Sequence, residues 1–228
     1  VSVRIKMIYK FISIEGNIGA GKTTLASLLA EEFHGQLILE AFEDNPYLPK
    51  FYEDNNKYAL QLEMSFLIER YQQLTRMFSE PNIFSNFTVT DYMLKKCLLF
   101  AKVNLSKQEY KLYKIFFDQV YKKLPKPEII FYLHADTDQL MRNIRKRGRE
   151  YEQNMSRIYL NRLEKMYFEF FKQNPENKYV IIDVNGIDWI SNVFAYRQLL
   201  KLFDREYAVG LNFVKLEQEA LLHVDASV

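Results

Sequence analysis

The segment from residue 16 to residue 23 carries the strongest chemical signal in the sequence. It is Gly-Asn-Ile-Gly-Ala-Gly-Lys-Thr, which fits the phosphate-loop pattern. In such a loop backbone N–H groups turn toward phosphate oxygens, Lys22 reaches the β and γ phosphates, and Thr23 ligates Mg²⁺. A structural glycine-rich turn is the alternative, but a strand expected before the loop and a helix expected after it favour the phosphate site. The predicted ATP contacts here are Gly16, Asn17, Ile18, Gly19, Ala20, Gly21, Lys22, Thr23 and Thr24.

Two further features could complete a phosphoryl transfer. The reaction needs an acceptor in line, a group that takes the acceptor's proton, and cations over the spreading charge. Glu40 ends a predicted strand and could take the proton, while the dense basic cluster from Arg142 to Arg149 could supply the cations. The guanine-reading pattern Asn-Lys-x-Asp is absent from the sequence, which disfavours a GTP switch. These features favour a kinase.

Several segments together resemble the deoxynucleoside kinase family, from about residue 10 to residue 206. They are the phosphate loop, Glu40, Asp-Asn-Pro-Tyr at 44–47, Phe-Tyr-Glu at 51–53 and Arg-Gly-Arg-Glu-Tyr-Glu-Gln at 147–153. The resemblance implies transfer of the γ-phosphoryl group of ATP to the 5′-hydroxyl of a deoxynucleoside, with Mg²⁺, in nucleotide salvage. The alternatives are a nucleoside monophosphate kinase of the thymidylate type and a non-catalytic structural relative.

The resemblance implies catalytic roles for one carboxylate and two arginines. Glu40 corresponds to the general base that accepts the proton of the 5′-hydroxyl, with Glu43 and Asp44 as neighbouring competitors. Arg147 and Arg149 correspond to an arginine lid that closes over the phosphates and stabilises the charge of the transition state.

The lid departs from the family in one position. Asn143 stands where the family often has another arginine, so Arg142 or Arg145 would have to substitute, and Arg145 is included among the ATP contacts. A solvated basic helix face or a nucleic-acid patch is the alternative, although no aromatic residues are interleaved with the cluster. Asp183 and Asn185 resemble a segment that lies near the ATP base in the family.

Four residues resemble the family's nucleoside contacts. Tyr52 and Glu152 match the pair that hydrogen-bonds the sugar 3′-hydroxyl, which implies a deoxynucleoside. Glu63 stands where most members carry a Gln that pairs with the base, and Arg70 matches the base-site arginine. An ionised Glu accepts hydrogen bonds without donating, which favours bases that offer N–H groups and, we expect, a purine. The alternative is that Arg70 only neutralises Glu63 as a structural pair.

The largest departure follows the third predicted strand. The sequence is Asp-Tyr-Met at 91–93, where the family has Asp/Glu-Arg-Ser. Asp91 can still organise Mg²⁺ and the substrate through water, and Lys95 or Lys96 is the candidate to replace the missing arginine. Phe100 would stack on the base, with an ordinary core Phe as the alternative.

Alternating strands and helices must position these residues. Helical periodicity is expected over 24–33, 60–78, 107–123, 136–147 and 155–173. The pattern predicts a doubly wound α/β fold with a five-stranded parallel sheet and helices on both faces. Ligands bind beyond the carboxyl ends of such strands, where Glu40 and Asp91 stand. The predicted strands are Phe11 to Glu15, Gln36 to Glu40, Phe87 to Asp91, Glu128 to His134 and Lys178 to Val184.

Composition sets the remaining expectations. The chain has 228 residues and a formal net charge of +2, so we expect a single domain over 1–228 with a lid at about 142–153, and neither a nucleic-acid nor a membrane partner. One cysteine, Cys97, and only short apolar runs favour a soluble cytoplasmic protein. The segment of about 208–228 could be a peripheral helix or an oligomer contact, and the resemblance implies a homodimer.

Overall fold

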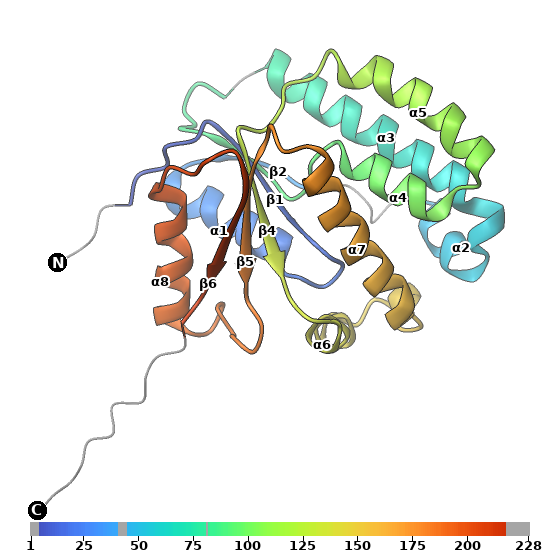
Figure 1. Ribbon diagram of the computed structural model, residues 1–228. Helices are drawn as coiled ribbons and strands as arrows, with labels where there is room; N and C mark the ends of the chain where they lie inside the picture. The colour runs from blue at the N-terminus through green and yellow to red at the C-terminus, as the bar shows by residue number, and fades with distance from the viewer. Residues whose placement is uncertain (1–4, 41–44, 81, 218–228) are drawn as a thin grey trace, which may run out of the picture.

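A parallel sheet forms the centre of the computed structural model, which describes residues 5–40, 45–80 and 82–217 (Figure 1). The strand order is β2-β3-β1-β4-β5-β6, and every neighbouring pair is parallel. The chain leaves β1 toward one edge of the sheet and later crosses to β4 on its other side, so a topological switch point lies at the carboxyl end of β1. The strands are β1 (Phe11–Gly16), β2 (Gln36–Ile38), β3 (Thr88–Thr90), β4 (Ile129–His134), β5 (Lys178–Asp183) and β6 (Gly210–Lys215).

The prediction of five strands was wrong, because the sheet has six. The strand β6 pairs with β5 along its whole length, from Gly210 opposite Lys178 to Lys215 opposite Asp183. It lies in the segment that the sequence suggested as a peripheral helix or oligomer contact. An edge strand is covered on one side only and carries a weak apolar pattern, so the partner strand, and not the local sequence, decides its conformation. Residues 218–228 of the predicted tail lie outside the described residues.

Helices cover both faces of the sheet, as predicted (Figure 1). The helices α1 and α8 lie on one face, and α3, α4, α5 and α7 lie on the other. Single-turn 3₁₀ segments follow α6 at Glu150–Glu152 and α8 at Leu202–Asp204. The α-helices are α1 (Lys22–Phe33), α2 (Tyr47–Glu53), α3 (Asn55–Ser79), α4 (Lys96–Asn104), α5 (Lys107–Tyr121), α6 (Thr137–Arg147), α7 (Arg157–Gln173) and α8 (Val193–Lys201).

The central strand β4 shows why both faces are covered. Its residues alternate between two apolar clusters, with Phe131 and Leu133 in the cluster that includes α1 and α8 and Tyr132 in the cluster that includes α7. These three side chains are no more than 1% exposed. Because successive side chains of a strand point to opposite faces, a strand that is apolar throughout requires a layer on each side.

Side chains and one glycine mark the ends of several helices. Asp54, Asp136 and Ser156 each accept a hydrogen bond from a backbone N–H of the first turn that follows. Ser106 and Glu109 form a reciprocal capping box at the start of α5. Gly148 ends α6 in the left-handed conformation, with φ of 76°. The chain therefore leaves α6 sharply within the predicted lid, between Arg147 and Arg149.

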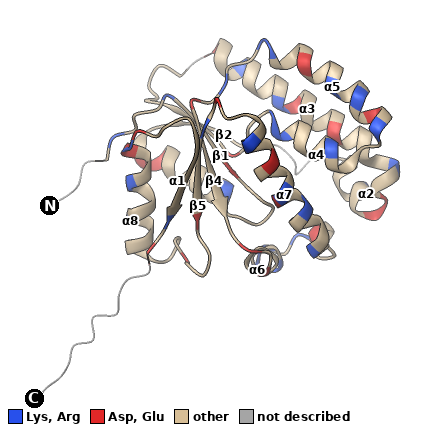
Figure 2. Ribbon diagram, viewed as in Figure 1, with Lys and Arg blue, Asp and Glu red and all other residues tan. Residues whose placement is uncertain are grey.

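The helices show neither a membrane span nor a surface of one charge sign. None in the described ranges combines the length and the apolar composition that crossing a bilayer requires. Figure 2 shows Lys and Arg interspersed with Asp and Glu along α3, α5 and α7. Charges of both signs therefore alternate along these three helices.

Candidate active site

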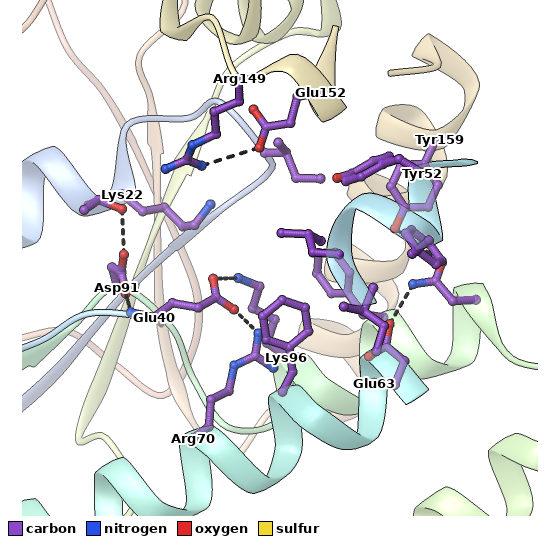
Figure 3. A pocket seen from close by; sticks show the side chains of 18 of the residues that line it. Lys22, Glu40, Tyr52, Glu63, Arg70, Asp91, Lys96, Arg149, Glu152 and Tyr159 are labelled. Carbon is purple, nitrogen blue, oxygen red and sulfur yellow. Dashed lines mark hydrogen bonds and ion pairs between the residues drawn. The ribbon is translucent and has the colours of Figure 1, made fainter. Parts of the chain in front are cut away.

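A cavity lies at the carboxyl ends of the strands, between the phosphate loop, α2, α3, α4, α7 and the lid (Figure 3). An open cleft adjoins it, lined by the phosphate loop, α6 and residues 186–190. Lys22, Thr23, Arg147 and Arg149 line both spaces, so they mark the place where the two meet. The predicted residues that line the cavity are Ile18, Lys22, Thr23, Glu40, Tyr52, Glu63, Arg70, Asp91, Phe100, Arg147, Arg149 and Glu152.

The phosphate loop is held in shape by close packing and by Asn17. A side chain at Gly16 would lie 2.8 Å from the Leu133 carbonyl oxygen, and Gly16 has φ of 154°, so only glycine fits. The Asn17 side chain donates to the Leu160 carbonyl at 2.9 Å and accepts from the Ile18 N–H at 2.8 Å. The Lys22 ammonium donates to the Asn17 carbonyl at 3.0 Å. The loop is therefore preorganised, with Lys22 folded back over it.

Thr23 and Asp91 are joined directly. The Thr23 hydroxyl donates to Asp91 Oδ2 at 2.6 Å, and the other oxygen of Asp91 accepts from the backbone N–H of Glu40 at 2.7 Å. A hydroxyl and a carboxylate beside a phosphate loop suit Mg²⁺, which is usually bound through one or two protein oxygens together with phosphates and water. The described residues include no group of three or more His, Cys, Asp or Glu that could hold a metal alone. The donor set therefore fits a magnesium ion carried in with a nucleotide.

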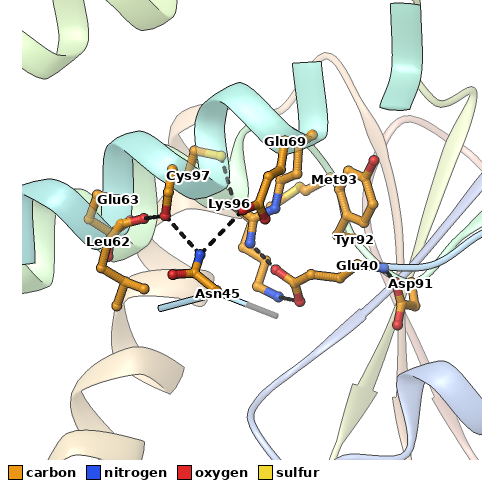
Figure 4. Close-up of polar contacts among 12 residues, drawn as sticks. Glu40, Asn45, Leu62, Glu63, Glu69, Asp91, Tyr92, Met93, Lys96 and Cys97 are labelled. Carbon is orange, nitrogen blue, oxygen red and sulfur yellow. Dashed lines mark hydrogen bonds and ion pairs between the residues drawn. The ribbon is translucent and has the colours of Figure 1, made fainter. Parts of the chain in front are cut away.

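Glu40 lies at the centre of a buried ionic network (Figure 4). Its carboxylate accepts hydrogen bonds from the guanidinium of Arg70 and, at 2.7 Å, from Lys96 Nζ. Burial acts to raise the pKa of Glu40, but the charges and hydrogen bonds of Arg70 and Lys96 outweigh it and hold that pKa well below its usual range. Glu40 is therefore ionised in the free cavity and can accept a hydrogen bond from a substrate hydroxyl.

Lys96, and not Lys95, supplies the cation beside Glu40. Lys96 points into the cavity from the first turn of α4, whereas Lys95 donates to Asn174 at 2.8 Å on the far side of that helix. Burial and the charge of Lys96 lower the pKa of the neighbouring Lys22 to about 8. Sequence reasoning named both lysines as candidates, and the orientation of α4 separates them.

The two lid arginines converge on Glu152. Arg147 Nε donates to Glu152 Oε2 at 3.1 Å, and Arg149 Nη1 approaches Glu152 Oε1 at 3.5 Å. Asn143, in the position of the family's further arginine, donates instead to the Gly19 carbonyl at 2.8 Å and ties α6 to the phosphate loop.

The candidate substitutes for that arginine lie in different surroundings. Arg142 and Lys146 line the open cleft, whereas Arg145 is exposed and is not among the residues that line it. The cation that sequence reasoning did not consider here is Lys146, which lies one helical turn from Arg142 on the same face of α6.

Tyr52 and Glu152 line the same wall of the cavity. The Tyr52 ring stacks on Tyr151 with centroids 5.7 Å apart, which fixes its orientation. Burial, followed by the neighbouring Tyr159 and Glu152, raises the pKa of Tyr52 well above its usual value. The phenol is therefore neutral and can donate a hydrogen bond beside a carboxylate that accepts one, an arrangement suited to a hydroxyl group.

Glu63 and Arg70 do not form the structural pair that was the alternative. Arg70 is occupied by Glu40 and by Cys97, whose sulfur accepts from Nη1 at 2.7 Å. Glu63 accepts instead from Asn104 Nδ2 at 2.7 Å. Phe66 and Phe100 line the cavity between these groups. Sequence reasoning missed Asn104, Phe66 and Tyr159, because nothing in their local sequence distinguishes them from other helical residues.

The remaining predicted residues lie apart from the cavity. The Asn185 side chain accepts from the Asp136 N–H at 2.7 Å, and Asp183 accepts from the Asn185 N–H at 3.0 Å, so both shape the strand ends. The neighbouring segment 186–190, which includes Trp189, lines the open cleft instead. Thr24 also lines that cleft. Glu43 and Asp44, the competitors of Glu40, lie outside the described residues.

Comparisons with known proteins agree on one family. The sequence model of deoxynucleoside kinases matches residues 12–206. The chain is 38% identical over 193 residues to a deoxyguanosine kinase of Bacillus subtilis, covering 83% of this chain and 93% of that protein. It is 29% identical over 209 residues to a deoxyadenosine kinase of Lactobacillus acidophilus, covering 86% and 95%. A structure of deoxyadenosine kinase from M. mycoides, with the products dCMP and dCDP bound, matches with a TM-score of 0.71 and 27% identity, covering 84% and 95%.

Proposed function

Because the chain belongs to the deoxynucleoside kinase family and is an ATP-dependent deoxynucleoside kinase, we propose that its cavity binds a purine deoxynucleoside, with deoxyguanosine preferred. The observation that carries this proposal is the buried Glu63 at one end of a cavity whose other end holds Glu40 and the phosphate loop. The cavity receives the nucleoside and the open cleft receives ATP. We further propose one kinase domain over 1–228, with a lid at about 142–153.

In this proposal Glu40 is the proton acceptor of the transfer. The bond between the γ-phosphorus and the β–γ bridging oxygen breaks, a bond from that phosphorus to the 5′-oxygen forms, and the 5′-hydroxyl proton goes to Glu40. The low pKa of Glu40 suits a loose transition state, in which the hydroxyl keeps its proton until late and needs orientation more than a strong base. Lys22, Arg147 and Arg149 stabilise the charge that spreads over the transferring group.

Thr23 and Asp91 are the proposed holders of Mg²⁺. The ion supplies charge neutralisation at the β and γ phosphates when it is bound. Asp91 also accepts from the backbone N–H of Glu40, so the same carboxylate that meets the metal sets the position of the proton acceptor.

The sugar and base contacts explain why we propose a purine deoxynucleoside. In this proposal Tyr52 donates a hydrogen bond to the 3′-hydroxyl and Glu152 accepts one from it. Phe66 and Phe100 offer aromatic faces to the base. Glu63 in its ionised form accepts from N–H groups, which guanine presents side by side. The relative with 38% identity is named a deoxyguanosine kinase, which supports the same base.

An acceptor panel tests this proposal. ATP-dependent phosphorylation is measured for deoxyguanosine, deoxyadenosine, deoxycytidine, thymidine and their 5′-monophosphates under identical conditions. We expect turnover of nucleosides with deoxyguanosine first. Turnover of monophosphates alone would identify a nucleotide kinase. If no acceptor were phosphorylated, and the melting temperature did not change on addition of ATP and Mg²⁺, a non-catalytic relative would be supported.

We also propose that the enzyme is a homodimer and works in the cytoplasm. Leu112, Ile115 and Phe116 stand on one face of α5 and are each at least 52% exposed, which is costly for a lone chain. Sedimentation of the wild type should give a dimer, and Leu112→Lys with Phe116→Lys should give a monomer. A monomeric wild type would contradict this proposal.

A further inference from the structure

Glu63 lies on the side of the cavity opposite Lys22 and Asp91, and its surroundings suit two protonation states (Figure 3). Its side chain is 1% exposed. Its Oε1 accepts from Asn104 Nδ2 at 2.7 Å, and the Tyr159 hydroxyl donates to Asn104 Oδ1 at 3.3 Å. The amide of Asn104 is thereby oriented with its N–H toward the carboxyl group. An amide hydrogen bond is compatible with either a carboxylate or a neutral acid.

No cation among the described residues forms an ion pair with Glu63, since Arg70 and Lys96 both bind Glu40. Burial raises the pKa of Glu63 to about 7, and the Asn104 hydrogen bond and the charge of Arg70 oppose that rise. Both protonation states are therefore accessible near neutral pH. The titratable groups that face Glu63 from the surrounding elements are Glu40 after β2, Arg70 on α3, Lys96 and Cys97 on α4, Tyr113 on α5 and Tyr159 on α7.

The two states of a carboxyl group match different base edges. A carboxylate only accepts, whereas a neutral acid donates one hydrogen bond and accepts another. Guanine presents two adjacent donors, its N1–H and its 2-amino group. Adenine presents an acceptor at N1 beside the donor of its 6-amino group, and cytosine presents the same pair at N3 and its 4-amino group. One buried carboxyl group can thus complement either set by losing or gaining a proton.

We propose that Glu63, oriented by Asn104, reads the base in two protonation states: the carboxylate selects deoxyguanosine, and the neutral acid admits deoxyadenosine or deoxycytidine. The inference rests on the proposed function, because it assigns the base end of the cavity to Glu63. Bound guanine stabilises the carboxylate and expels a proton from the neutral fraction. Bound adenine stabilises the acid and takes up a proton. The two ligands should therefore exchange protons with opposite signs.

Isothermal titration calorimetry of the full chain tests these signs. Deoxyguanosine and deoxyadenosine are each titrated at about pH 7 in buffers that differ in their heat of ionisation, which counts the protons exchanged. We expect net proton release with deoxyguanosine and net proton uptake with deoxyadenosine, since both protonation states of Glu63 are accessible there. Between about pH 5.5 and about pH 8.5, the ratio of the two affinities should move at least about tenfold toward deoxyguanosine.

Two variants separate base reading from a structural role. Glu63→Gln keeps the size but cannot titrate, so both proton counts should fall to zero and the affinity ratio should lose its pH dependence. Asn104→Leu removes the hydrogen bond that lowers the pKa of Glu63. In that variant proton release with deoxyguanosine should increase and uptake with deoxyadenosine should decrease. The exposed Glu31→Gln on α1 is the control and should match the wild type.

The inference is supported if the wild type exchanges protons of opposite sign with the two nucleosides and Glu63→Gln exchanges none. Equal proton counts for the two nucleosides, or an exchange that persists in Glu63→Gln, would overturn it. Phosphorylation is measured separately on the same preparations. Proton exchange of opposite sign without phosphorylation of either nucleoside would overturn the proposed function and leave the base reading standing.

Discussion

Glu40, which is largely buried, and Glu63, which is fully buried, lie in one cavity, and they differ in almost every contact. Glu40 binds Arg70 and Lys96, and its pKa lies well below the usual range. The carboxyl group of Glu63 accepts a hydrogen bond only from the neutral amide of Asn104 among the described residues, and its pKa rises to about 7. Burial acts in the same direction on both, so the difference comes from the partners.

This difference divides the cavity into two chemical environments. The end near the phosphate loop is built from charged groups, which suit a reaction that moves negative charge. The other end holds Glu63 with the amide of Asn104, and the rings of Phe66 and Phe100, which pack against Arg70 and Lys96, offer aromatic faces to a flat heterocycle. A pair of titratable groups whose surroundings push their pKa values apart is a common sign of divided roles. Three substitutions test the division, in order of expected effect, and a fourth, outside the cavity, gives a stability effect for comparison.

Glu40→Gln should have the largest effect. It keeps the shape of the side chain but removes the proton acceptor, so we expect kcat to fall by about 10²- to 10⁴-fold with a smaller change in KM. Steady-state kinetics on the preferred nucleoside, with a melting curve to confirm folding, measures this. Glu43→Gln and Asp44→Asn are the matched variants and should keep their turnover. If either variant lost its activity while Glu40→Gln kept its activity, that neighbour, and not Glu40, would be the proton acceptor.

Lys96→Met should come next, with Lys95→Met as its matched control. Removing Lys96 leaves Glu40 with one cation, so the pKa of Glu40 rises and the carboxylate protonates at a higher pH. The acidic limb of the kcat profile should move to higher pH, and kcat near neutral pH should fall about tenfold or more. Lys95 donates to Asn174 outside the cavity, so its variant should retain the wild-type profile. If the kcat profiles of Lys96→Met and Lys95→Met were identical, Lys96 would have no role in the reaction.

Phe100→Leu should act on binding more than on rate. The side chain lines the cavity, and Leu keeps an apolar surface but loses the flat face that the base would stack on. We expect the KM for the nucleoside to rise about tenfold, in line with about 1–3 kcal/mol for a stacked base, while kcat changes little. A fall in kcat at constant KM would show that the two ends of the cavity are not separable in this way.

Glu164→Gln should have the smallest effect, because it lies outside the cavity. His134 Nε2 lies 2.7 Å from Glu164 Oε1, and this hydrogen bond raises the pKa of His134 above its usual value, against an opposing effect of burial. A raised folded-state pKa contributes stability below the unfolded value of about 6.5, and that contribution is lost as pH rises through the folded value. The free energy of unfolding of the wild type should exceed that of the variant by at most about 1 kcal/mol at acidic pH, and this difference should disappear at alkaline pH. Urea unfolding at several pH values measures this, and a gap that widens with pH would contradict it.

Much of the reaction chemistry was predictable because it depends on local sequence. The phosphate loop needs glycines, Lys22 and Thr23 in fixed order between a strand and a helix, and all of these are adjacent in the chain. The strand β4 could be identified because it is apolar on both faces. The edge strand β6 could not, since only its pairing with β5 makes it a strand.

The fold class, the phosphate loop and the family can be predicted from the sequence, because they follow from periodicity and from short motifs whose residues act together. Which lysine contacts Glu40, and that Asn104 and not Arg70 contacts Glu63, depends on how the elements pack in three dimensions. These choices join residues from 41 to 56 positions apart on separate elements. The charge state of a buried carboxyl group depends on such neighbours in space, so it is settled by the packing of helices and not by the residue type.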